Sequence, residues 1–266
     1  MKLGVIGCGK MGSALIGGAI RAKAIEASQV IGFDPYPAAA EAFTAATGAP
    51  STADLMDLAD CESFLLATKP QTAADALHSL KESGVRDAAL VSIAAGLTIE
   101  WLEKHSPQGF RIVRSMPNTP ALVGKGASAF ARSARATDTD AAFASKLLGS
   151  VGLAIEVPES MIDAVTGLSG SGPAYIYLAI EALTDGGVEV GLPREQALQL
   201  ATQTVLGAAT MVLETGRPPA ELRDHVTSPG GTTLAGLASL EKTGFRQSLI
   251  RAVAAATARA TELGKG

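Results

Sequence analysis

The chain has 266 residues, of which 47% are hydrophobic and 18% charged, and its net charge is −4. These values predict a globular protein with enough residues for two domains, and they argue against a disordered chain. The lack of a lysine or arginine cluster argues against nucleic acid or a membrane as the partner. Two cysteines, Cys8 and Cys61, are too few for a disulfide framework, and no signal peptide precedes the first predicted strand. We therefore expect a cytoplasmic, reducing location.

The N-terminal stretch predicts a dinucleotide-binding turn. An apolar strand over residues 2–6 runs into glycines at positions 7, 9 and 12, and a helical apolar pattern follows from Ser13. In such a turn Gly7 allows the sharp bend, Gly9 lets the backbone approach a pyrophosphate, and Gly12 lets helix and strand pack closely. The pyrophosphate would bind the free N–H groups at the helix start. The alternative is that the glycines serve only a tight turn.

A second apolar strand, over residues 30–33, ends at Asp34, which lies 22 positions after Gly12. This spacing is typical of the carboxylate that binds a ribose hydroxyl in dinucleotide-binding folds. Asp34 would repel a 2′-phosphate, and no lysine or arginine lies between residues 24 and 68. The residues by themselves therefore favour NADH over NADPH.

The following residues predict alternating helices and strands, which make residues 1–160 a Rossmann-type α/β domain. Helices are expected over residues 37–46, up to residue 58 with a cap at Ser51 or Thr52, and from Pro70 to residue 80; strands are expected over residues 63–67, 89–93, 111–116, 127–131 and 153–157. The apolar strands up to residue 116, which helices separate, predict a parallel sheet that is covered on both faces. Ligands of such a sheet bind beyond the carboxyl ends of its strands.

Several distinctive residues follow these carboxyl ends. Lys69 is expected to be extended because it precedes a proline, and it is either a ligand for a dinucleotide ribose or phosphate or a solvated lysine. Asn118 lies between two prolines and is expected to face the site, the alternative being an asparagine that closes a turn. Ala94, Ala95 and Gly96 are small enough to lie beneath a flat nicotinamide ring.

From residue 161 onward the sequence predicts only helices. Pro173 opens a long helix, Pro193 opens the next, and the last runs over residues 245–263. Residues 196–213 carry no charge, but their glutamines and threonines indicate a packed helix rather than a membrane span. Because these helices are apolar over more than one face, we expect an all-helical domain over residues 161–266 that buries its apolar surplus against another subunit.

A second candidate site lies at residues 228–233, with the sequence SPGGTT. Two glycines and two threonines at a predicted helix start offer N–H groups and hydroxyls to an anion. A carboxylate fits better than a phosphate because no lysine or arginine accompanies the motif. An ordinary capped helix start is the alternative. The histidines add no further site: His78 and His105 are expected to be solvated and His225 to be structural.

Two C-terminal motifs resemble those of the pyrroline-5-carboxylate reductase family: residues 167–175 (GLSGSGPAY) and residues 226–237 (VTSPGGTTLAGL). The resemblance covers the whole chain, including residues 67–70 (ATKP) and 116–120 (MPNTP). It implies reduction of 1-pyrroline-5-carboxylate to L-proline, the last step of proline biosynthesis, with NADPH or NADH as hydride donor. It also implies a homodimer with interlocked helical domains, often assembled further.

The resemblance also implies site residues. The cofactor would be lined by Gly7, Cys8, Gly9, Lys10, Met11, Asp34, Asp54, Thr68, Lys69, Ala94, Ala95 and Gly96, to which the reasoning above adds Asn118. The substrate would be held by Val226, Gly231, Thr232 and Thr233, with the Thr233 hydroxyl as the catalytic group on the imine nitrogen. No metal is expected. An imine can be protonated in solution, so positioning would supply most of the acceleration and no further acid catalyst is required.

Two other functions stay open. A related two-domain dehydrogenase acting on a 3-hydroxy acid would need a general base, and no lysine lies in the long helix after Pro173. A nucleotide-sensing or scaffold protein of the same fold would have no turnover, and the intact threonine motif argues against it.

Overall fold

The structure is a computed structural model that describes residues 2–264, in which two compact units are distinguished. The α/β unit comprises the residues up to Ser171 and those from Ala255 onward, and the helical unit comprises Gly172–Ala254. The two units are defined by contacts in space and not by a limit in the sequence. The domain limit predicted at residue 160 therefore stays a prediction.

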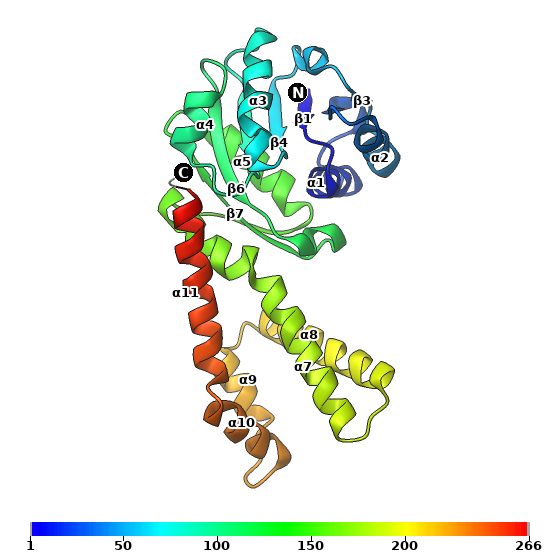
Figure 1. Cartoon of the computed structure of the whole chain (residues 1–266), viewed down its shortest axis with the longest axis vertical. Coiled ribbons are helices and arrows are strands. Elements are labelled where there is room, and N and C mark those ends of the chain that lie inside the picture. Colours follow the sequence, from blue (N-terminus) through cyan, green and yellow to red (C-terminus); the bar gives the residue numbers. More distant parts are fainter. Residues whose placement is uncertain (1, 265–266) are drawn as a thin grey trace. The chain divides into compact units, whose positions relative to one another are not determined.

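The α/β unit contains one sheet of eight strands in the order β3-β2-β1-β4-β5-β6-β7-β8 (Figure 1). The strands are β1 (Leu3–Ile6), β2 (Val30–Phe33), β3 (Ser51–Thr52), β4 (Ser63–Leu66), β5 (Ala89–Ser92), β6 (Arg111–Met116), β7 (Gly126–Arg132) and β8 (Gly152–Glu156). Strands β1 to β6 pair in parallel, and the chain reverses its direction of travel across the sheet on either side of β1. The crevice beyond such a reversal is where doubly wound sheets bind ligands.

The parallel sheet predicted for the strands up to residue 116 is confirmed, and beyond them the sheet contains one antiparallel pair. Strand β7 runs antiparallel to β6, with Val113 opposite Arg132, and β8 then pairs with β7 in parallel. A parallel pair needs a crossover of about a dozen residues or more, usually with a helix. Between β6 and β7 the chain forms only a 3₁₀ turn over Thr119–Val123 and a left-handed Gly124, so it returns as a hairpin.

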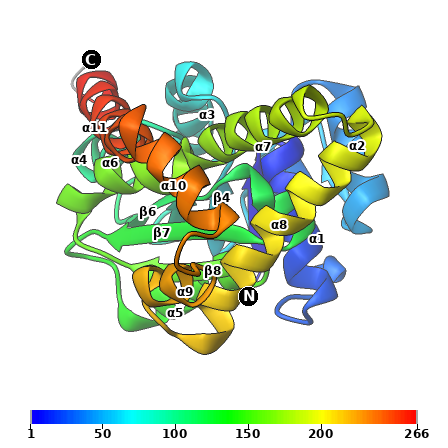
Figure 2. The ribbon, with the colours of Figure 1, turned by 90° about the horizontal axis from the view of Figure 1, so that it is seen from below.

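Helices cover both faces of this sheet, as predicted. Helices α1 (Lys10–Arg21) and α5 (Asp138–Gly149) pack on one face, and α3 (Pro70–Glu82) and α4 (Ile99–His105) pack on the other (Figure 2). Successive strand residues alternate between the two resulting cores: Leu65 lies in the first, and its neighbours Phe64 and Leu66 lie in the second. Helix α2 (Pro37–Thr47) follows β2, and further 3₁₀ turns span Ala27–Gln29 and Glu159–Met161.

The cap predicted for the helix that ends at residue 58 is wrong. Ser51 and Thr52 form β3, and the helix is a 3₁₀ turn over Leu55–Leu58 whose cap is Asp54. The Asp54 carboxylate accepts the Met56 N–H at 2.9 Å. A carboxylate caps a helix as well as a hydroxyl does. Ser51 and Thr52 do not serve as the cap because they belong to a strand.

A buried ion-pair network fixes the last turns of the chain to the α/β unit. Arg114 on β6 is 6% exposed and donates to Glu159 at 3.2 Å and to Asp163 at 3.1 Å. Glu159 also accepts the Ile99 N–H at 2.7 Å, and Asp163 accepts the Thr261 hydroxyl at 3.0 Å. One arginine therefore connects β6, the start of α4, α6 (Ile162–Val165) and the end of α11 (Phe245–Leu263).

The helical unit follows a π-helical turn over Thr166–Gly170. Its helices are α7 (Gly172–Glu189), α8 (Arg194–Thr215), α9 (Pro219–His225), α10 (Thr232–Lys242) and the first part of α11. As predicted, no strand follows β8 within residues 2–264. The uncharged stretch 196–213 lies within α8, and in the described part of the chain no helix meets the length and apolarity that a membrane crossing demands.

Candidate functional site

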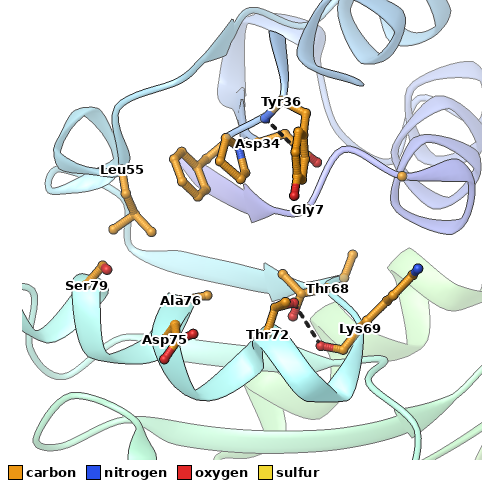
Figure 3. Close-up of a pocket in the computed structure, with 14 residues that line it drawn as sticks. Gly7, Asp34, Tyr36, Leu55, Thr68, Lys69, Thr72, Asp75, Ala76 and Ser79 are labelled. Atoms are coloured by element: carbon orange, nitrogen blue, oxygen red, sulfur yellow. Dashed lines mark hydrogen bonds between the residues drawn. The ribbon is translucent and has the colours of Figure 1, made fainter. Parts of the chain in front are cut away.

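A pocket of about 590 Å³ lies at the carboxyl ends of β1, β2 and β4 (Figure 3). Five of the residues predicted to contact a cofactor line it: Gly7, Gly9, Asp34, Thr68 and Lys69. The reversal of the chain at β1 leaves this crevice between the turn that follows β2 and the start of α3. The sequence therefore predicted five of the residues that line this pocket, and their contact with a cofactor stays a prediction.

The glycine loop has the geometry that its spacing predicts. Gly7 has a φ of +101°, and a Cβ there would lie 2.8 Å from the carbonyl carbon and oxygen of Ala67. A Cβ on Gly12 would lie 2.7 Å from the Gly7 carbonyl oxygen, so α1 passes directly against the strand end. A Cβ on Gly9, by contrast, would meet no atom within 4 Å, and Gly9 caps α1 without a side-chain hydrogen bond. The first amides of α1 are thus available to an anion in front of Gly9.

Asp34 is held in place by the backbone on two sides. Its side chain is buried, one carboxylate oxygen accepts the Cys8 N–H at 2.9 Å, and the other accepts the Tyr36 N–H at 3.0 Å. The carboxylate thereby joins the glycine loop to the turn after β2, while each oxygen retains a further acceptor site for a ribose hydroxyl.

The Cys8 thiol takes no part in this polar arrangement. A Cβ on Gly32 would lie 2.8 Å from Cys8 Sγ, so the sulfur packs onto strand β2. Burial, and then the negative charge of Asp34, raise the pKa of the Cys8 thiol to about 12. The thiol is neutral and unreactive at physiological pH, and its backbone N–H is already bonded to Asp34. Contact between Cys8 and a cofactor stays a prediction.

Thr68 and Lys69 follow β4 on the opposite side of the pocket. The Thr68 hydroxyl oxygen is buried and has no hydrogen-bond partner among residues 2–264. A buried hydroxyl without a partner costs free energy, and a bound ligand would relieve that cost. Lys69 is extended, as predicted from Pro70, and its carbonyl accepts the Thr72 hydroxyl at 3.1 Å while its side chain lies along the pocket. These observations fit a pyrophosphate and ribose bound across the loop.

Other residues predicted to contact the cofactor lie outside the lining of this pocket: Cys8, Lys10, Met11, Asp54, Ala94, Ala95, Gly96 and Asn118. The Asn118 amide is bonded at both ends, to the Ser169 carbonyl at 3.0 Å and to the Ala127 N–H at 2.8 Å. Gly96 has a φ of +81° and lies near Leu263 at the end of α11. A nicotinamide contact at these residues stays a prediction.

Sequence reasoning missed the distal wall of the pocket. Its lining also includes Phe33 at the end of β2, Pro35 and Tyr36 after β2, Leu55, Ala67, and Thr72, Asp75, Ala76 and Ser79 of α3. The α3 residues follow the three- and four-residue spacing of one helix face. That spacing, counted from Lys69, was the signal that could have found them.

The threonine motif begins a helix, as predicted. Gly231 is the N-cap of α10, Thr232 is its first residue, and no side chain caps the helix start. A Cβ on Gly231 would lie 2.2 Å from Ser228 Oγ and 3.2 Å from the Ser228 carbonyl oxygen, so the preceding turn packs closely against this position. In the described chain neither Thr232 nor Thr233 uses its hydroxyl in a hydrogen bond, and Val226 is exposed at the end of α9. The motif thus offers unpaired amides and hydroxyls together.

Two known families match the two parts of the chain. Residues 2–96 match the family described as NADP oxidoreductase coenzyme F420-dependent, and residues 159–263 match pyrroline-5-carboxylate reductase dimerisation. The pyrroline-5-carboxylate reductase of Methanosarcina acetivorans is 45% identical over 99% of this chain and 98% of its own length. That of Pisum sativum is 46% identical over 98% of this chain and 95% of its own.

Solved structures agree with these similarities. A pyrroline-5-carboxylate reductase from Coxiella burnetii superposes with a TM-score of 0.93 at 35% identity, covering 100% of this chain and 99% of the other. The Plasmodium falciparum pyrroline carboxylate reductase with NADP bound superposes with a TM-score of 0.87 at 36% identity, covering 99% and 98%.

Proposed function

This chain belongs to the pyrroline-5-carboxylate reductase family, and we propose that it reduces 1-pyrroline-5-carboxylate to L-proline with a hydride from NADPH or NADH. The observation that carries the proposal is 45% identity to a named reductase over 99% of the chain. A Rossmann-type pocket and a helix start with free amides supply a place for each reactant. The reaction is the last step of proline biosynthesis, and the cytoplasm stays its predicted compartment.

Reduction of the cyclic imine depends more on the positioning of the two reactants than on acid or base catalysis. The bound dinucleotide supplies a hydride to the imine carbon. The glycine loop and the Thr68 hydroxyl hold the dinucleotide, while the amides at the start of α10 bind the substrate carboxylate. Thr233 is the second residue of α10. Its hydroxyl donates a hydrogen bond to the ring nitrogen of a neutral imine or accepts one from a protonated imine. The nitrogen takes its proton from solution, and the product is a secondary amine.

A dinucleotide oxidation assay tests this proposal. With 1-pyrroline-5-carboxylate present, the absorbance of NADH or NADPH at its nicotinamide band is expected to fall, and without this substrate it is expected to stay constant. Proline formed in the same reaction should match the dinucleotide consumed, mole for mole. Turnover with a 3-hydroxy acid in the oxidative direction, and none with pyrroline-5-carboxylate, would instead identify the related dehydrogenase. Dinucleotide binding without turnover of either substrate would identify a nucleotide sensor.

Cofactor choice depends on Asp34 in this proposal. The residues favour NADH, whereas family resemblance favours NADPH, so we expect both to work and NADH to be less disadvantaged than is usual in the family. Asp34→Ser is expected to raise the ratio of kcat/KM for NADPH to that for NADH, because it removes the charge that repels a 2′-phosphate. Initial rates with each dinucleotide measure this ratio.

The hydrogen bonds of Asp34 require a control for that measurement. Asp34→Ser also removes the acceptors of the Cys8 and Tyr36 N–H groups, so KM for both dinucleotides can rise together. Asp34→Asn preserves the size and one acceptor oxygen while removing the charge, and it should shift the ratio in the same direction. If the ratio is unchanged in both variants, Asp34 does not contact the ribose of the cofactor.

Burial in the helical unit supports a homodimer as the working form. Among residues 172–254, all of which the structure describes, only Thr184, Ala197 and Ala201 are buried, and all three are small. Large apolar side chains such as Leu178 and Leu213 are 66% and 82% exposed. A unit of this size needs a core to fold stably, which supports a second copy as the source of the missing contacts.

Light scattering coupled to size-exclusion chromatography tests the dimer. We expect a molar mass of at least twice that of one chain at the concentration used for the activity assay. Activity and mass should fall together on dilution, because the helical unit loses its core when the copies separate. A species of one chain's mass with full activity would contradict the proposal.

A further inference from the structure

The loop between β5 and α4, over residues 93–98, is fixed by hydrogen bonds at both of its ends. At its start the Ile93 N–H donates to the Leu66 carbonyl at 3.0 Å, which continues the pairing of β5 with β4. At its far end the Ile99 N–H donates to the Glu159 carboxylate at 2.7 Å, across 60 residues of sequence. The conformation of the loop therefore depends on a carboxylate that belongs to a distant part of the chain.

One buried arginine holds that carboxylate in place. Arg114 is 6% exposed, and two of its nitrogens bond separately, Nη1 to Glu159 at 3.2 Å and Nη2 to Asp163 at 3.1 Å. Glu159 Oε1 accepts both the Arg114 N–H and the Ile99 N–H. Hydrogen bonds between charged groups are strong, and the planar guanidinium fixes their directions. Without this arginine the Glu159 side chain, which is partly exposed, would be free to turn into solvent and release the loop.

Arg114 also acts on the loop from a second side, through Asp163 and the end of α11. Asp163 uses the oxygen that Arg114 leaves free to accept the Thr261 hydroxyl at 3.0 Å. This bond holds the last turn of α11 beside the loop, where a Cβ on Gly96 would lie 3.8 Å from both Cβ and the carbonyl oxygen of Leu263. The loop, α6 and the last turn of α11 all belong to the α/β unit. One guanidinium thus fixes two of the neighbours of the loop.

The place of this loop in the sheet gives its fixation a chemical consequence. Strands β1, β2, β4 and β5 are parallel, so the loops that follow them lie at one edge of the sheet. A dinucleotide whose pyrophosphate binds the glycine loop, and whose adenosine ribose binds Asp34 after β2, extends its other half away from β2, toward β4 and β5. The small residues at positions 94–96 then form the surface beneath the nicotinamide ring.

We propose that Arg114 is a positioning residue for hydride transfer, because through Glu159 and Asp163 it fixes the loop on which the nicotinamide ring rests. This inference rests on the proposed use of NAD(P)H and adds a residue that acts through the loop. A mobile loop leaves the pyrophosphate and adenosine contacts intact, but the ring is then held in the reactive geometry for less of the time. Displacement of reacting atoms by about 1 Å can lower a rate about a hundredfold. The rate should therefore depend on Arg114 more strongly than the affinity for the dinucleotide does.

Hydrogen exchange of the whole protein without dinucleotide tests whether Arg114 fixes the loop. Arg114→Lys preserves the buried positive charge, but one ammonium group cannot reproduce two separately directed hydrogen bonds. We expect the amides of residues 93–99 to exchange about tenfold faster in this variant, while those of β1 and β2 exchange as in the native protein. Glu159→Ala should have the same effect. Glu159→Gln retains an oxygen that can accept the Ile99 N–H, so exchange should stay near the native rate.

Cofactor binding and kinetics test whether the loop positions the ring. In Arg114→Lys and in Glu159→Ala we expect kcat with pyrroline-5-carboxylate to fall about tenfold, while the dissociation constant of NADH, measured by nicotinamide fluorescence, stays within about twofold of the native value. The deuterium isotope effect on kcat, measured with NADH deuterated at the transferred position, should rise because hydride transfer then limits the rate more. Glu159→Gln should regain most of the lost activity.

Arg111→Lys is the matched control. Arg111 is the first residue of β6, at the opposite edge of the sheet, and pairs with the buried Asp140 at 2.9 Å. This variant should lower the melting temperature but preserve the native exchange of residues 93–99, kcat and the isotope effect.

Three results would overturn the proposal: native exchange of residues 93–99 in both Arg114→Lys and Glu159→Ala, an equal loss of kcat in Arg111→Lys, or a loss of NADH affinity as large as the loss of kcat. A native protein that binds NADH but does not reduce pyrroline-5-carboxylate would contradict the proposed function. In that case the exchange of residues 93–99, with and without NADH, still decides whether Arg114 fixes the loop.

Discussion

Thr233→Ala is expected to lower kcat/KM for pyrroline-5-carboxylate by roughly ten- to hundredfold. The substitution preserves the start of α10, with Gly231 as N-cap and Thr232 as first residue, and removes only the hydroxyl that we propose to contact the ring nitrogen. A hydrogen bond to a charged group contributes roughly 1.5–3 kcal/mol, which corresponds to that loss in rate. Steady-state kinetics with varied pyrroline-5-carboxylate and saturating dinucleotide measure the effect.

Thr232→Ala is the matched control, because Thr232 is proposed to act through its backbone amide and should lose much less activity. The dissociation constant for NADH should barely change in either variant, since the residues that line the cofactor pocket all belong to the α/β unit. If Thr233→Ala kept full activity while Thr232→Ala abolished it, the hydroxyl on the imine nitrogen would belong to Thr232 instead.

Gly7→Ala is expected to lower the free energy of unfolding by about 2–4 kcal/mol, enough to be seen as a lower melting temperature. The left-handed φ of +101° disfavours any residue with a Cβ, and that Cβ would overlap the backbone of Ala67 at 2.8 Å. Neither backbone segment can move freely, because β1 and β4 are paired at the centre of the sheet. Thermal unfolding followed by circular dichroism measures the change.

Gly9→Ala separates folding from binding in the same loop. Its φ of −71° suits any residue, and no atom lies within 4 Å of the added methyl position, so the melting temperature should stay that of the native protein. The methyl would instead occupy the space where the pyrophosphate approaches α1, and NADH binding should weaken on the order of tenfold or more. A Gly9→Ala protein that binds NADH normally would place the pyrophosphate away from this loop.

The sequence determined the elements that depend on local patterns. Glycine spacing, apolar strand runs and proline positions predicted β1, β2 and the helices that start near Pro70 and Phe245. These features follow from backbone sterics and from the periodicity of apolar residues, both of which are properties of neighbouring residues in the chain. The position of Asp34 at the end of β2 follows from the same local reasoning.

Tertiary structure decided what depends on residues far apart in the sequence. The antiparallel direction of β7 depends on a short connection that cannot accommodate a crossover, although its residues look like those of any buried strand. The Asn118 amide is bonded between Ser169 and Ala127, and no local pattern could indicate these partners. Residues of α3 line the same pocket as Tyr36 only because α3 lies beside the turn after β2.

The same distinction explains why the two candidate sites were predicted unequally well. The glycine loop and the start of α10 are each proposed to bind through consecutive backbone amides, so a few adjacent residues define them. The distal wall of the cofactor pocket consists of side chains from β2, Leu55 and α3, which share no sequence motif. A site made of backbone amides can be recognised from a short stretch of sequence. A pocket between several strands and helices forms only when the folded sheet brings those elements together.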